Sequence, residues 1–193
     1  MPPKTTINKE DVIKAAFELM RKEGLNGFSA RNVGKQLGCS TQPIYSLFKN
    51  MRLLENEAIE YAAKYTTQKY LALNGEKQTF LDTGVGYVQM ALEEKALFNL
   101  LYNSGKVHVD MRRNIYPVNA VQLIEDMKKY DRLKGLNEEV LYDLLNDMWV
   151  FTHGLAVLLC NCNDAFNENY IRARIQRVGD SIIERILKEA IET

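Results

Sequence analysis

The residues with the most distinctive chemistry lie in one short stretch on either side of Gly38. A glutamine amide can pair with an adenine edge through one donor and one acceptor, while a threonine methyl and a proline ring can touch a thymine methyl. Tyrosine, serine, lysine and arginine side chains suit phosphate oxygens. Residues of these types here are Ser29, Arg31, Thr41, Gln42, Pro43, Tyr45, Ser46 and Lys49. We expect these eight residues to contact double-stranded DNA, with the later ones entering its major groove.

Two short predicted helices position this set. Ser29 is expected to cap the first, Gly38 to close it, and Ser40 to cap the second. Ile44 and Phe48, four residues apart, then face a core and leave the polar residues between them outward. A turn this tight makes the helices cross steeply, as in a helix-turn-helix. An ordinary helical corner with solvated polar residues remains the alternative.

The charge distribution indicates that the N-terminal part of the chain binds phosphate groups. The chain has 193 residues and a formal net charge of zero, with 25 basic and 25 acidic residues. Residues 1–50 hold eight Lys or Arg against four acids, which leaves 17 basic and 21 acidic residues in 51–193. A basic head on an acidic body is typical of a nucleic-acid-binding domain joined to a different one. We therefore predict a DNA-binding domain over 1–50 and a second domain over 51–193.

Helical periodicity continues through the rest of the chain, and no stretch has the alternation of a strand. Asn8 is a predicted cap of the first helix, and Asn137 and Asn167 of the last two. A break is expected at Asn74-Gly75, and Pro117 is expected to start a helix that runs to Tyr130. The sequence thus predicts an all-α fold of about nine helices, three of them in the head. Residues 140–159 are apolar on more than one face, which favours a homodimer through the last two helices.

Other classes of function find little support in the residues. The sequence pairs no nucleophile with a base and has no phosphate-binding loop, so we predict no catalytic residues and no cofactor. His108 with Asp110 is too sparse for a metal site. Cys39, Cys160 and Cys162 are expected to be reduced thiols. The absence of an apolar run of membrane length predicts a cytoplasmic protein with no membrane partner.

Residues 9–54 resemble the N-terminal domain of the TetR family of transcriptional regulators. The likeness runs through Gly24-Leu25, Phe28-Ser29-Ala30-Arg31, Leu37-Gly38, Ile44-Tyr45, Phe48-Lys49-Asn50 and Leu53-Leu54. It implies that Thr41 to Ser46 lie on the recognition helix, that Lys49 is the phosphate-binding lysine, and that Arg31 contacts DNA. Gly34 departs from the family pattern, in which alanine is usual. The resemblance also implies a C-terminal helical sensor and a repressor that is released from a palindromic operator by a small molecule.

Aromatic and polar residues on the middle helices are candidates for the effector pocket, because ligand pockets are mostly apolar with few hydrogen-bonding groups. A ligand that binds better when the two heads are mis-spaced would draw the dimer off its operator. An activator, a redox-responsive variant that uses Cys160 or Cys162, and a helical small-molecule binding protein or enzyme with a merely structural head remain alternatives. The candidate pocket residues are Tyr61, Tyr65, Tyr87, Met90, Phe98, Tyr102, Tyr116, Gln122, Trp149 and His153.

Overall fold

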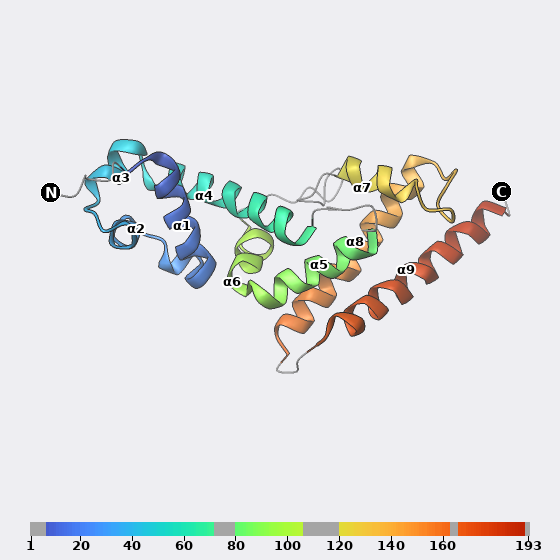
Figure 1. Cartoon of the computed structure of the whole chain (residues 1–193). Coiled ribbons are helices and arrows are strands. Elements are labelled where there is room, and N and C mark those ends of the chain that lie inside the picture. The colour runs from blue at the N-terminus through green and yellow to red at the C-terminus, as the bar shows by residue number, and fades with distance from the viewer. Residues whose placement is uncertain (1–6, 72–79, 106–119, 163–165, 192–193) are drawn as a thin grey trace. The chain divides into compact units, whose positions relative to one another are not determined.

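The computed structural model describes residues 7–71, 80–105, 120–162 and 166–191. Within these ranges the chain forms nine α-helices and no strand, which confirms the predicted all-helical fold (Figure 1). The α-helices are α1 (Lys9–Glu23), α2 (Ala30–Leu37), α3 (Gln42–Leu47), α4 (Met51–Thr66), α5 (Phe80–Glu93), α6 (Lys95–Phe98), α7 (Ala120–Met127), α8 (Glu138–Cys160) and α9 (Glu168–Ile191). A 3₁₀ turn, η1 (Gly24–Gly27), and two π-helical segments, η2 (Thr67–Leu71) and η3 (Asn99–Asn103), complete the elements.

The chain divides into two compact units. Unit 1 comprises the described residues of Met1–Thr66 and Glu94–His108, and unit 2 those of Thr67–Glu93 and Val109–Thr193. The predicted boundary after Asn50 coincides with the start of α4, whereas α4, α6 and η3 all belong to unit 1. The chain therefore leaves unit 1 at the end of α4 and returns to it at the end of α5.

Unit 1 is built around the apolar face of α1. Val12, Phe17 and Met20 on this helix are buried against residues of α2, α3, α4 and η3. The Phe17 ring lies 5.0 Å from the rings of both Tyr61 and Tyr65 on α4. The core of the head is thus closed by α4 and η3, and not by the first three helices alone.

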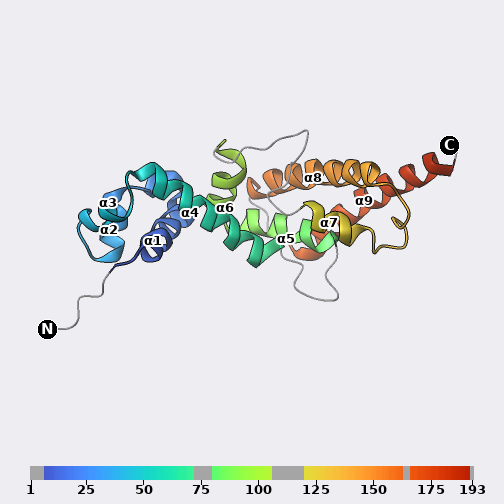
Figure 2. The same cartoon turned by 90° about the horizontal axis from the view of Figure 1, so that it is seen from above.

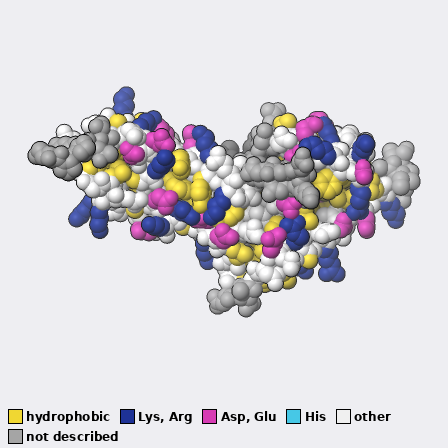
Figure 3. Space-filling model, viewed as in Figure 1, with side chains coloured by type: hydrophobic (Ala, Val, Ile, Leu, Met, Phe, Trp, Pro, Cys, Tyr) yellow, Lys and Arg dark blue, Asp and Glu magenta, His cyan; other side chains and the backbone are white. Residues whose placement is uncertain are grey.

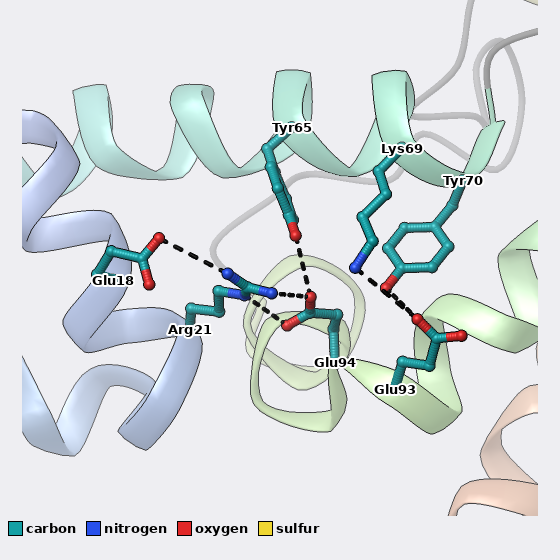
Figure 4. Close-up of polar contacts among 7 residues, drawn as sticks. All are labelled: Glu18, Arg21, Tyr65, Lys69, Tyr70, Glu93 and Glu94. Atoms are coloured by element: carbon teal, nitrogen blue, oxygen red, sulfur yellow. Dashed lines mark hydrogen bonds and ion pairs between the residues drawn. The ribbon is translucent and has the colours of Figure 1, made fainter.

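A partly buried ion pair ties α1 to the start of α6 in unit 1 (Figure 4). The guanidinium of Arg21 donates two hydrogen bonds to Glu94, at 2.8 and 2.6 Å, and the Tyr65 hydroxyl donates a third at 3.1 Å. Arg21 also lies 5.1 Å from the centre of the Tyr65 ring and 3.7 Å from a carboxylate oxygen of Glu18. Glu94 raises the pKa of Arg21, mainly by accepting its hydrogen bonds. The three bonds satisfy a carboxylate that has little access to water.

Unit 2 consists mainly of three long helices, α5, α8 and α9, which pack against one another (Figure 2). The π-helical segment η2 lies on α5, and the approach is close at Gly86, where a Cβ atom would overlap the carbonyl oxygen of Tyr70. Only glycine fits between these two backbones. None of the helices in the described residues is long and apolar enough to cross a membrane.

Most of the predicted helix starts have the expected caps. Asn8 forms a capping box with Asp11, and the amide oxygens of Asn137 and Asn167 accept hydrogen bonds from backbone N–H groups at the starts of α8 and α9. The prediction that Ser40 caps the second helix of the turn is wrong. The N-cap of α3 is Thr41, which has helical backbone angles and makes no side-chain cap bond. The break at Asn74-Gly75 and the start at Pro117 lie outside the described residues.

Candidate DNA-binding surface and ligand cavity

The turn between α2 and α3 depends on two glycines. Gly38 has φ 66° and ψ 29°, the left-handed conformation that closes α2, and its N–H bonds back to the carbonyls of Gly34 and Lys35. At Gly34, an added Cβ would lie 2.9 Å from the carbonyl oxygen of Cys39, closer than real Cβ contacts allow. The turn passes so near α2 that residue 34 can carry no side chain without a shift, which explains the departure from alanine.

The short helix α3 separates its apolar and polar faces clearly. Ile44 and Phe48 are buried in the unit 1 core, as the four-residue spacing predicted. Tyr45 is 54% exposed although its ring is large and apolar. Packing does not explain an exposed aromatic ring in the middle of this helix, whereas a partner surface would.

The remaining predicted DNA contacts lie around Tyr45 on the same segment. Thr41, Gln42, Ser46 and Lys49 are exposed, and Pro43 is half-buried in the first turn of α3. The Ser46 hydroxyl donates to the carbonyl oxygen of Gln42 at 3.0 Å, so its oxygen keeps only acceptor capacity for a partner.

Two further predicted contacts lie at the start of α2. The Ser29 hydroxyl accepts a hydrogen bond from the Asn32 N–H at 3.2 Å and retains its own hydrogen to donate. Arg31 is exposed, and neither Arg31 nor Lys49 forms an ion pair with any described residue. Figure 3 shows Lys and Arg side chains standing out from the surface of unit 1, with acids between them. Cations without internal partners are available to bind phosphate.

Unit 2 contains a cavity of about 630 Å³ between α5, α7, α8 and α9 and the segments beside them. Its walls are largely aliphatic and aromatic, with two Arg–Asp ion pairs and a few neutral polar groups. This volume falls in the range typical of small-molecule sites. The lining residues are Leu71, Phe80, Leu81, Asp82, Thr83, Gly84, Tyr87, Leu123, Tyr130, Arg132, Leu133, Leu144, Met148, Trp149, Thr152, Arg172, Ile175, Gln176, Gly179, Asp180 and Ile183.

Two of the ten predicted pocket residues, Tyr87 and Trp149, line this cavity. His153 lies directly behind them: its Nδ1 is 2.8 Å from the Tyr87 hydroxyl oxygen, and its ring stacks on Trp149 at 5.0 Å between centroids. Burial lowers the pKa of His153, which favours the neutral imidazole. Met90 is fully buried on α5 and does not line the cavity.

The other predicted pocket residues lie elsewhere. Tyr61, Tyr65, Phe98 and Tyr102 belong to unit 1, because α4, α6 and η3 pack on the core of the head. Burial there raises the pKa of Tyr102. On α7, Gln122 is exposed and bonds to Asp126, and Tyr116 lies outside the described residues. The cavity therefore brings together only part of the predicted set.

Several cavity residues were not predicted from the sequence, above all those of α9. The last two helices are the predicted dimer interface, and Ile175, Gln176 and Gly179 of α9 line the cavity. Gly84 and Gly179 also line the cavity, and each faces a side chain of another helix, Ile175 and Met148 respectively.

Among the described residues, no group of three or more His, Cys, Asp or Glu side chains has the geometry to hold a metal ion. His108 and Asp110 lie outside those residues. Cys39 and Cys160 are half-buried, Cys162 is exposed, and all three are free thiols. The Cys160 thiol lies 3.4 Å from the Val157 carbonyl oxygen of its own helix.

Comparison with known proteins finds sequence similarity to tetracycline repressors. No family model matches the sequence. The tetracycline repressor proteins of class D from Escherichia coli and class H from Photobacterium damsela subsp. piscicida are each 32% identical to it over 108 residues. Those residues are 55% of this chain and 46% of each relative, so the chain spans about half the length of the curated relatives that it matches.

Two solved structures share the fold over nearly the whole chain. A Rhodococcus sp. protein assigned to the TetR family of transcriptional regulators has a TM-score of 0.54 at 15% identity, over 90% of this chain and 97% of its own. A TetR-family transcriptional regulator from Streptomyces coelicolor has a TM-score of 0.51 at 15% identity, over 96% and 95%.

The fold and the exposed α3 define an all-helical protein with an N-terminal helix-turn-helix. The sequence likeness to tetracycline repressors over 108 residues and the fold likeness to two TetR-family regulators both support the predicted resemblance to the TetR family.

Proposed function

We propose that the protein is a ligand-responsive transcriptional repressor that binds a palindromic operator as a homodimer and leaves it when a small molecule enters the cavity of unit 2. The observation that carries the proposal is the exposed face of α3, with Gln42 and Tyr45 outward and the exposed Lys49 just after the helix, while Ile44 and Phe48 fix the helix to its core.

DNA contact would be divided between two kinds of side chain. Gln42, with the methyl of Thr41 and the ring of Pro43, would read base edges, each good bidentate contact contributing about 1–3 kcal/mol of discrimination. Lys49, Tyr45 and Arg31 would bind phosphate, with the Ser29 hydroxyl donating beside them, and so fix the position of the helix without reading sequence.

A dimer supplies the second head that specific binding needs. Val150 and Leu158 on α8 are exposed, and Gly154 lies one turn from each on the same helix. Such an apolar row on a helix surface fits a second copy of the same helix across a two-fold axis. Two heads bound to successive major grooves would be about 34–36 Å apart, one turn of DNA.

The effector would act by differential affinity for the two states of the dimer. A ligand shifts the equilibrium toward release only as far as it binds the released state better than the DNA-bound state. The cavity of about 630 Å³ in unit 2 is the proposed site. In this proposal α5 would carry the change, since it lines the cavity and its chain continues at Glu94 into unit 1.

Selection of bound sequences from a random duplex library tests the DNA-binding proposal. We expect an inverted repeat whose half-sites are about one helical turn apart. The Gln42→Ala variant should select a different or degenerate base at one position of each half-site. Gln68→Ala, which changes an exposed glutamine in unit 2, should select the same repeat as the unaltered protein. Recovery of no common sequence would refute the proposal.

A further inference from the structure

We propose that the cavity of unit 2 takes an uncharged, largely apolar molecule that carries one hydrogen-bonding group, and that this group pairs with the Thr83 hydroxyl. The inference deepens the proposed function and rests on it for the biological role of the ligand. Three features of the cavity carry it: its walls, the state of its charges, and one unpartnered hydroxyl.

The walls determine that the ligand is mainly apolar. Most of the lining side chains are aliphatic or aromatic. Trp149 and Tyr87 contribute aromatic rings, and Leu144 of α8 and Ile175 of α9 contribute aliphatic side chains. Removing apolar surface of a ligand from water stabilises the complex by roughly 25 cal/mol per Å². A cavity of about 630 Å³ has room for a molecule with a ring or a medium alkyl chain.

The charged groups of the cavity are already paired. Arg172 contacts Asp82 at 2.6 Å and Glu168 at 2.9 Å. Arg132 contacts Asp180 at 2.6 Å and lies 4.0 Å from Glu184. Each arginine therefore has two acidic neighbours, and each aspartate that lines the cavity already holds an arginine. A charged ligand of either sign would lose hydration without gaining a free counter-charge, which disfavours it.

Among the described residues, the Thr83 hydroxyl is a buried polar group that makes no hydrogen bond. The residue lines the cavity from α5 and is 8% exposed, and its Oγ1 has no hydrogen-bond partner among the described residues. A buried hydroxyl without a partner is costly, so such a group is expected to be satisfied by something that binds beside it. It can donate to a carbonyl or ether oxygen, or accept from a hydroxyl.

Competition against a fluorescent probe tests the ligand class. Trp149 is the only tryptophan of the chain and lines the cavity, so quenching of its emission by N-phenyl-1-naphthylamine reports binding at this site. 1-Octanol, octanoate and octylammonium share one alkyl chain and differ in their head group. We expect octanol to displace the probe at concentrations at least about tenfold lower than either ion. Equal displacement by an ion, or no quenching at all, would overturn the inference.

Substitution of the hydroxyl tests the role of Thr83. Thr83→Val keeps the shape and should weaken octanol binding roughly fivefold, the value of one net hydrogen bond. Thr83→Ser keeps the hydroxyl and should retain the affinity of the unaltered protein. The matched control is Thr66→Val, since the Thr66 hydroxyl is buried in unit 1 and already donates within its own helix. Unchanged octanol affinity in Thr83→Val would overturn the assignment of this residue.

The same preparation separates this inference from the proposed function. If octanol shows no advantage while the selected duplex still binds, only the ligand class is wrong. If the order of the three octyl compounds holds while no duplex binds, the regulatory function is wrong and the ligand class stands.

Discussion

The two adjacent glutamates at the end of α5 offer a sensitive test of how burial sets the strength of an ion pair (Figure 4). Glu94 accepts from Arg21 and Tyr65, and its side chain is 6% exposed. Glu93 accepts from the Tyr70 hydroxyl at 2.7 Å and lies 3.8 Å from Lys69, but its side chain is 57% exposed. Glu94→Gln and Glu93→Gln are thus the same change on neighbouring residues with similar partners.

The expected losses of stability differ because water can hydrate the groups left without a partner at the exposed Glu93 but not at the buried Glu94. Removing one partner of a fully buried pair costs about 3–5 kcal/mol. Arg21 keeps 31% exposure and has Glu18 nearby, and glutamine still accepts one hydrogen bond, so we expect about 2 kcal/mol for Glu94→Gln. The exposed pair at Glu93 should contribute less than about 0.5 kcal/mol.

Urea unfolding and thermal unfolding, both followed by circular dichroism, measure both variants. Glu94→Gln should lower the free energy of unfolding by about 2 kcal/mol, which corresponds to a fall of roughly 4–8 °C in Tm for a chain of this size. Glu93→Gln should shift Tm by no more than about 2 °C. Equal losses in the two variants, or a loss at Glu93 alone, would refute the argument from burial.

Three further variants test other parts of the structure. Gly34→Ala should cost about 1–3 kcal/mol of stability and lower duplex affinity, because its Cβ would press on the Cys39 carbonyl; unaltered duplex affinity in a binding titration would contradict the turn geometry. Burial lowers the pKa of His153, so as pH falls below about 6.5 the unfolded chain takes up a proton at this histidine before the folded protein does. The free energy of unfolding measured in urea should therefore fall between pH 7.5 and 5.5. This fall should be smaller in His153→Gln. Leu158→Asp should give a monomer by light scattering without disturbing the protomer, since Leu158 is 67% exposed; an unchanged mass would exclude this face from the dimer.

The head could be predicted from the sequence because its signals are local. Capping by Asn8 and Ser29, the left-handed Gly38 and the spacing of Ile44 and Phe48 each depend on neighbouring residues only. The one local error, Ser40 as the cap of α3, arose where two polar residues in succession both suit the position.

The cavity could be predicted only in part, because helical spacing defines the faces of a helix and not what each face packs against. Tyr61 and Tyr65 have the spacing of a pocket wall, yet their face of α4 covers Phe17 in the head. The π-helical segments η2 and η3 add a residue to a turn and so shift the faces of the residues that follow. Neither segment has a signal that separates it from an ordinary α-helix in the sequence.

The central claim is that the segment from Thr41 to Lys49 enters a groove of double-stranded DNA, and the salt dependence of duplex binding tests it most directly. Titration of the selected fluorescent duplex at two salt concentrations should give a steep loss of affinity with salt. Lys49→Ala should reduce the slope by about one per protomer, while Lys188→Ala, an exposed lysine near the end of α9, should leave it unchanged. A slope in Lys49→Ala equal to that of the unaltered protein would contradict the account.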